Sequence, residues 1–213
     1  MNTVAYLKQI YDFGEPIFVD RIRIGRKSKN AIKEDLYRAT KKGLIYRKRK
    51  GVYYFKSDRE FDPGITFEQI LESRYIKDDL GLPGFEEINR YGYITGFAFL
   101  NMIGLTNQVP MQIDIVTNNI KSKKRTIRNG MQVAVIRKAK ETINNTNWRA
   151  FQFFDMFYIL TVEDIKRNRE FLIDYMKKNI SSFMFSHCLQ LYGDKIADKM
   201  TAGGITIYEY TRR

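Results

Sequence analysis

The sequence predicts an α+β fold in two parts: a winged helix-turn-helix domain over residues 1–57 and a larger mixed α+β domain over residues 58–213. Three observations support this prediction. Helical and strand patterns alternate over the first part, which also holds most of the excess positive charge. A polar segment without periodicity follows at residues 56–65 and contains Pro63-Gly64. Beyond it, strand patterns that predict a small antiparallel sheet give way to a helical C-terminal half.

The first domain is predicted to run helix, short strand, helix, helix and hairpin. Residues 3–12 place apolar side chains at helical spacing, and GEPIFV indicates a turn and a very short strand. DRIRIG, which ends at Gly25, fits a helix of one to two turns. The longest helix starts after Ser28, a natural N-cap, and stops at Gly43. Two short strand patterns then predict a basic hairpin, whose tip is Lys48, Arg49, Lys50 and Gly51.

This order of elements is typical of a winged helix-turn-helix, in which the last helix enters the major groove of DNA. Residues 1–57 contain 15 Lys+Arg and 5 Asp+Glu, whereas residues 58–213 contain 22 and 19. Positive charge concentrated in a small unit favours a polyanion partner, most often nucleic acid. The alternatives are a basic helical hairpin that binds protein and a basic surface without a partner. The outward positions of the last helix are Lys29, Asn30, Lys33, Tyr37 and Lys41.

The second domain is predicted to open with a capped helix. Thr66 and Gln69 have the spacing of a capping box, and the inward residues of the helix are Ile70, Leu71 and Tyr75. The segment GLPGF is expected to break this helix. A second helix is predicted over residues 91–104, with Thr95 near its start.

An abrupt turn connects that helix to the sheet. Gly104 can adopt positive φ, and Pro110 fixes its own φ and extends the residue before it. Thr106, Asn107 and Gln108 can hydrogen-bond the backbone groups left open between them, so we expect a structural joint. MQIDIVT then alternates with period two, and KRTIR and MQVAVI flank the hairpin signal Asn129-Gly130.

Helices are predicted for most of the chain after residue 140. The expected segments are NWRAFQFFDMFYIL, VEDIKRNREFLIDYMKKN with Thr161 as its cap, SSFMFSHCLQLYG and KIADKM. A short strand-like tail, ITIYEY, follows them.

The residues give little support for catalysis, and no enzymatic activity, cofactor or metal site is expected. His187 and Cys188 are adjacent on a predicted helix, where neighbours point about 100° apart, so they are expected to be core or boundary residues. A zinc site needs about four ligands, usually Cys or His, and the chain has one of each. Asp114 could begin a nuclease-like arrangement, but Ile136 stands where the second carboxylate is needed. Asp114 is therefore expected to be a charge at a strand edge.

The expected location is the cytoplasm, without a membrane association. No segment approaches the roughly 20 apolar residues of a membrane helix. MNTVAYLKQI lacks the apolar core and the cleavage site of a signal peptide. A single cysteine, Cys188, fits a reducing compartment.

Two segments resemble the AbiE-type antitoxins of type IV toxin–antitoxin systems. YGYITGFAFLNMIGLTNQVPMQIDIVTNN is similar to that family's A-N-x-L-G-L-(S/T)-x-Q-V-P segment, except that Leu100-Asn101-Met102 precedes Ile103-Gly104-Leu105 here. KKGLIYRKRKGVYYF is similar to the family's KG-x-I-x-R-x-x-x-G-x-Y signature. The resemblance covers roughly residues 1–140.

The resemblance implies a DNA-binding autorepressor that occupies inverted repeats in its own promoter and counteracts a nucleotidyltransferase-like toxin. It implies no catalytic residues, and it does not say whether antitoxin and toxin form a direct complex. The residues it assigns to DNA are Arg26, Lys27, Ser28, Lys29, Asn30 and Lys33 on the recognition helix and Arg47, Lys48, Arg49 and Lys50 in the wing. Two alternatives remain at this stage: a stand-alone regulator with a ligand-sensing second domain, and an enzyme of unrecognised type.

Overall fold

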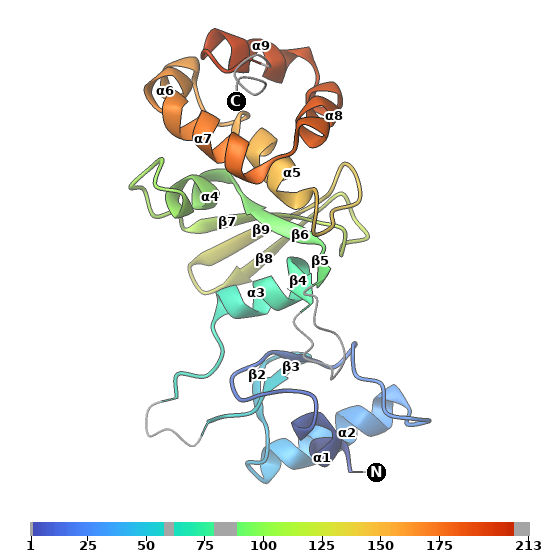
Figure 1. Ribbon diagram of the computed structural model, residues 1–213. Coiled ribbons are helices and arrows are strands. Elements are labelled where there is room, and N and C mark those ends of the chain that lie inside the picture. Colours follow the sequence, from blue (N-terminus) through green and yellow to red (C-terminus); the bar gives the residue numbers. More distant parts are fainter. Residues whose placement is uncertain (1, 58–61, 79–88, 207–213) are drawn as a thin grey trace. The chain divides into compact units, whose positions relative to one another are not determined.

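The computed structural model describes residues 2–57, 62–78 and 89–206, and it confirms the α+β class (Figure 1). The chain divides into two compact units. The first comprises Met1–Arg74 and Asp78–Ile88, and the second comprises Tyr75–Lys77 and Asn89–Arg213.

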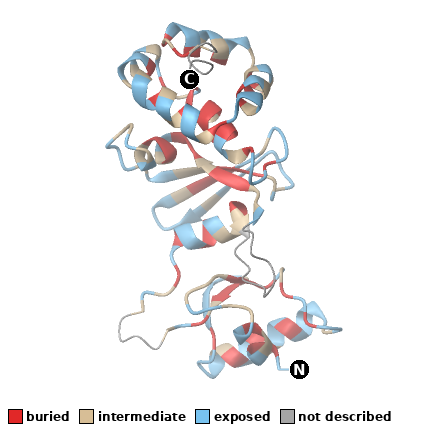
Figure 2. Cartoon of the chain, viewed as in Figure 1, coloured by how far each residue is buried: buried red, intermediate tan, exposed pale blue. Residues whose placement is uncertain are grey.

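The first unit packs two helices against a three-stranded antiparallel sheet of order β1-β3-β2. Its elements are α1 (Thr3–Lys8), β1 (Ile17–Phe18), α2 (Lys29–Lys41), β2 (Tyr46–Arg49) and β3 (Val52–Tyr54). Leu7, Ile17 and Leu36 are buried in one apolar cluster with contributions from α1, α2 and the sheet. Along α2 the buried residues Ile32, Leu36 and Ala39 recur at helical spacing, as the sequence predicts (Figure 2).

The short helix predicted for residues 20–25 is wrong, because the chain forms turns and irregular backbone there. Ile22 and Ile24 are both buried, whereas Arg23 between them is exposed. This period of two suits extended backbone, since a helix would turn residues i and i+2 to different faces. The Arg23 guanidinium donates to the carbonyl oxygens of Asp20 and Ile22 at 2.8 and 2.9 Å, which holds the turn.

Helix α3 (Phe67–Tyr75) begins at the predicted capping box: Thr66 Oγ1 accepts from Gln69 N, and Gln69 Oε1 accepts from Thr66 N. Ile70 joins Phe18, Val52 and Ile65 in a small apolar cluster. The Arg74 guanidinium donates to both Asp20 carboxylate oxygens, at 2.7 and 2.6 Å. These contacts explain why the first unit extends to Arg74, whereas the sequence prediction ended the domain at residue 57. The segment GLPGF lies outside the described residues.

The second unit contains a four-stranded sheet of order β6-β7-β9-β8. Its strands are β6 (Gly92–Thr95), β7 (Gln112–Thr117), β8 (Lys124–Asn129) and β9 (Gln132–Lys138), and β4 (Lys77–Asp78) pairs with β5 (Asn89–Arg90) in a separate sheet. The predicted hairpin at Asn129-Gly130 is confirmed. The predicted antiparallel pairing holds for β6 with β7 and for β8 with β9, but β7 and β9 pair in parallel, so the sheet is mixed. The chain places β8 at the outer edge before the hairpin returns β9 beside β7.

The helix predicted over residues 91–104 is only half correct. Residues 92–95 form β6, and α4 (Gly96–Met102) begins after it with Thr95 as N-cap. Tyr93 and Ile94 pair with Val116 and Ile115 of β7, so sheet hydrogen bonding overrides the helical spacing. The turn that follows has the predicted form only in part: Gly104 has φ of 77°, and the Thr106 hydroxyl accepts from Gln108 N at 3.2 Å. Among the described residues, the other side-chain bond of the turn comes from Asn101, whose Nδ2 donates to the Thr106 carbonyl at 3.1 Å, and not from Asn107 or Gln108.

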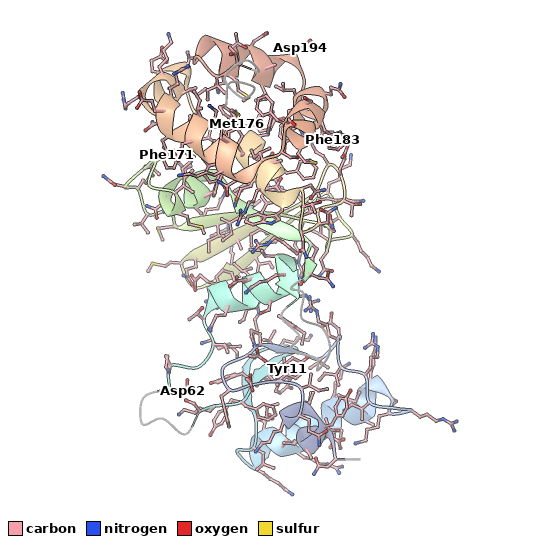
Figure 3. The ribbon with its side chains drawn as sticks, in the orientation of Figure 1. Tyr11, Asp62, Phe171, Met176, Phe183 and Asp194 are labelled. Carbon is pink, nitrogen blue, oxygen red and sulfur yellow. The ribbon has the colours of Figure 1, made fainter. Side chains whose placement is uncertain are left out.

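Figure 1 shows helices α5 to α9 gathered on one side of this sheet. They are α5 (Trp148–Met156), α6 (Val162–Arg167), α7 (Arg169–Asn179), α8 (Ser182–Tyr192) and α9 (Asp194–Ala202). The single helix predicted after Thr161 divides at Asn168, although its capping box with Asp164 is present. Met176 is buried among the helices, whereas Phe183 on α8 is exposed (Figure 3). Most of the predicted tail strand lies outside the described residues.

Candidate nucleic-acid interface

Helix α2 has one face in the core and one face in solvent. The Ser28 hydroxyl accepts a hydrogen bond from Ala31 N at 3.2 Å, so Ser28 is the N-cap that fixes where the helix begins. The five outward positions named from the sequence are all exposed, and Lys41 Nζ lies 5.7 Å from the centre of the Tyr37 ring. A cationic, hydrogen-bonding surface thus faces away from the core: Lys29, Asn30, Lys33, Tyr37 and Lys41.

The β2–β3 hairpin exposes the second group of cations. Its register shifts between Arg47 and Arg49, so Lys48 is the extra residue of a bulge. Gly51 closes the turn with φ of 78°, and its carbonyl oxygen accepts from Val19 N at 3.1 Å. That bond ties the turn to the body of the unit. The side chains of the tip are all exposed: Arg47, Lys48, Arg49 and Lys50.

Lys27 differs from the other residues assigned to DNA. Its ammonium group donates to Asp35 Oδ2 and to Thr3 Oγ1. The pKa of Asp35 is lowered, most by the hydrogen bond from Lys27 and next by the hydrogen bond from Thr3. Lys27 is therefore held in an ion pair that ties α1 to α2, while Arg26 beside it is exposed.

The second unit contains a cavity of about 430 Å³ that sequence reasoning missed. Strands β6, β7 and β9 and helix α5 contribute both apolar and polar side chains to its lining. Acidic, basic and aromatic side chains converge there, notably Asp114, Arg137, Lys140, Asp155 and Tyr158. Asp114 was expected to be a charge at a strand edge, and that expectation is wrong. It lies on β7, between β6 and β9, and forms an ion pair with Arg137 at 2.8 Å.

Asp155, on α5, is a second carboxyl group that lines this cavity. The hydroxyls of Tyr93 and Tyr192 donate to its two carboxylate oxygens at 2.8 and 2.7 Å. Burial raises the pKa of Asp155, and the two hydrogen bonds oppose that change. Lys140 Nζ lies 4.0 Å from the centre of the Tyr192 ring and 2.8 Å from the Tyr158 hydroxyl. The cavity therefore combines one shielded carboxyl with cations near its mouth.

His187 and Cys188 do not form a reactive pair. His187 Nε2 lies 2.8 Å from Glu141 Oε2, and the Phe183 ring stacks on the imidazole at 6.5 Å between ring centres. Cys188 is buried, and burial raises the pKa of its thiol to about 12. The thiol is therefore protonated near neutral pH and is a poor nucleophile.

Within the described ranges, no group of three or more His, Cys, Asp or Glu side chains could hold a metal ion. No helix in the same ranges is long and apolar enough to cross a membrane. Comparison with protein-family models, curated proteins and solved structures gives no match.

Proposed function

We propose that this chain is a DNA-binding repressor whose first unit is a winged helix-turn-helix domain. Helix α2 is the recognition helix and the β2–β3 hairpin is the wing. The turn around Asp20 to Gly25 takes the place of the short middle helix of the motif. One observation carries the proposal most strongly. The outward positions of α2 and the hairpin tip are exposed and mostly cationic, and apart from the Lys41–Tyr37 ring contact none of them has a side-chain partner among the described residues.

The resemblance to AbiE-type antitoxins extends this proposal. The repressor binds inverted repeats in its own promoter, and the second unit counteracts a nucleotidyltransferase-like toxin. The contacts assigned to DNA are Arg26, Lys29, Asn30 and Lys33 of the recognition helix and Arg47 to Lys50 of the wing. Ser28 serves as the helix cap and Lys27 as the partner of Asp35, so both act by positioning α2.

The cavity favours a second candidate, a regulator that senses a small ligand through its second unit. A volume of about 430 Å³ lies within the range of ligand sites, about 300–1,000 Å³. A ligand that binds only the folded state raises the melting temperature with its concentration, whereas a toxin–antitoxin pair needs no such ligand.

Asn30→Ala tests the repressor function. The Asn30 amide can pair bidentately with adenine, so its loss should weaken binding to the promoter repeats by about 1–3 kcal/mol while leaving random duplex DNA nearly unaffected. Asn107→Ala, at an exposed position of the second unit, is the control. Equal losses on both DNAs would remove Asn30 from base recognition.

The antitoxin function is tested by co-expressing the full chain with the product of the neighbouring gene and scoring growth. Variants of the full chain are preferable to fragments. A fragment that ends at residue 60 would leave Phe18 and Val52 without Ile65 and Ile70. Absence of any growth protection would refute the antitoxin part and leave the repressor part standing.

A further inference from the structure

Most of the excess positive charge of the second unit lies in one stretch of chain. Residues 118–140 contain eight Lys and Arg and no Asp or Glu. Elsewhere in the second unit, 12 Lys and Arg stand against 10 Asp and Glu. The second unit therefore has a balance of +10, and this stretch supplies +8 of it. Such segregation produces a local positive field that an average hides.

The structure places this charge on an open edge of the sheet. Strand β8 is an edge strand, and five of its six residues are exposed. Lys124 lies opposite Arg137, and Arg128 lies opposite Val133. Since facing residues share a side and side chains alternate along a strand, Lys124, Arg128 and Arg137 project from one face. Lys124, Thr126 and Arg128 are exposed on that face, so the helical layer does not cover it at β8.

The same face leads into the cavity through Arg137, which lines it. Arg137 donates one hydrogen bond to Asp114, and a guanidinium has five N–H groups in total. Two aromatic side chains that line the cavity are partly in solvent: Phe97 is 48% exposed and Tyr158 is 54% exposed. A basic strip thus ends at exposed rings beside a cavity.

We propose that this face of β8 and β9 binds single-stranded nucleic acid. Lys124, Arg128 and Arg137 contact the phosphates, and an unpaired base stacks on Tyr158 at the mouth of the cavity. Single-strand sites combine a cationic track with aromatic platforms in this way. A paired base cannot reach such a platform, because it stays stacked within the duplex. No residue of the first unit takes part, so the inference does not rest on the proposed repressor function.

The test uses the full chain and fluorescently labelled oligo-dT and oligo-rU of about 12 nucleotides, within the usual size of such sites. Replacing Lys124 and Arg128 together by Ala should lower affinity for the single strand. It should also flatten the salt slope by about 1.4, because each phosphate contact on a single strand contributes about 0.7. Lys166→Ala with Lys195→Ala removes the same charge from exposed positions on α6 and α9 and should leave the slope unchanged.

Tyr158 separates stacking from charge. Tyr158→Ala should weaken single-strand binding by roughly tenfold, and Tyr158→Phe, which keeps the ring, should restore it. Both proteins need the wild-type melting temperature, because the Tyr158 ring also packs 5.9 Å from that of Tyr192.

Three results would overturn the proposal. The first is a single-strand affinity that falls with the wing variant Lys48→Ala, Arg49→Ala, Lys50→Ala but not with the β8 variant. The second is an equal loss of duplex and single-strand binding in the β8 variant, which would make the face a duplex surface. The third is no binding of either oligonucleotide by the wild-type chain at low salt, which would leave the face to an acidic protein.

Discussion

Removal of the wing cations is the sharpest test of the first unit. Lys48, Arg49 and Lys50 are exposed and form no side-chain hydrogen bond or ion pair among the described residues. The turn that carries them depends on other atoms, the backbone of Gly51 and Val19. Replacing all three by Ala should therefore leave the fold and the melting temperature unchanged while it removes three positive charges.

The magnitude follows from the number of phosphates that the wing can contact. Each contact with duplex DNA contributes about 0.9 to the salt slope, so three contacts contribute about 2.7. Between about 50 and 200 mM salt, the wild-type chain should then lose roughly 40-fold more affinity than the variant. A single contact would give a difference of only about 3.5-fold. The measured difference therefore counts the cations that meet phosphate.

The assay is fluorescence anisotropy with a labelled duplex across that salt range, on promoter DNA and on random DNA. The loss should be similar on both, because phosphate contacts carry no sequence information. The matched control removes Lys166, Arg167 and Lys195, three exposed cations of α6 and α9. An unchanged slope in the wing variant, or an equal change in the control, would refute the placement of the hairpin at DNA.

Three further predictions concern the second unit. Gly104 has φ of 77° and no atom within 4 Å of an added Cβ, so Gly104→Ala should cost about 1–2 kcal/mol from backbone strain alone. Gly104→Asn should lower the unfolding free energy by less than Gly104→Ala does. Equal unfolding free energies for Gly104→Ala and the wild-type chain would contradict this prediction. Cys188 should resist iodoacetamide in the native protein near neutral pH and react only after unfolding, because burial raises its pKa to about 12; fast native labelling, followed by mass spectrometry, would contradict it. Burial also raises the pKa of Asp155 in the folded state. Ionisation of this carboxyl therefore lowers the free energy of unfolding as the pH rises from about 3.9, the pKa in the unfolded chain, through the higher folded pKa. The unfolding free energy of the wild-type chain relative to that of Asp155→Asn, measured by chemical unfolding, should fall over that pH window. A difference that instead rises with pH in favour of the wild type would contradict this prediction.

The elements that sequence patterns predicted well are those whose signals are local. Ser28 caps α2 through a bond that spans three residues, and Asn129-Gly130 turns a hairpin whose strands adjoin it. The exposed positions of α2 followed in the same way, because helical spacing alone assigns residues to the two faces of a helix. Each of these features needs only a few neighbouring residues to be specified.

The errors occur where distant partners decide the structure. Residues 92–95 pair with β7, about twenty residues further along the chain, and that pairing changes an apparent helix start into a strand. The parallel pairing of β7 with β9 depends on where β8 lies, which no local pattern reports. The turn at residues 20–25 did carry a local signal, the alternation of Arg and Ile.

The cavity illustrates a further limit of sequence reasoning. Asp155 lies in a segment rich in phenylalanine, where a single carboxylate gives no motif, and its partners Tyr93 and Tyr192 are 62 and 37 residues away. The basic strip on β8, in contrast, was visible in the sequence. In the balance over residues 58–213, its eight cations are offset mainly by residues 58–88, which contain nine Asp and Glu and only three Lys and Arg. A charge balance taken over a window the size of a hairpin separates the basic stretch from the acidic one. The reason is that electrostatic interactions are screened beyond about 10 Å at moderate salt. That distance corresponds to a few residues of a strand and is far shorter than a domain.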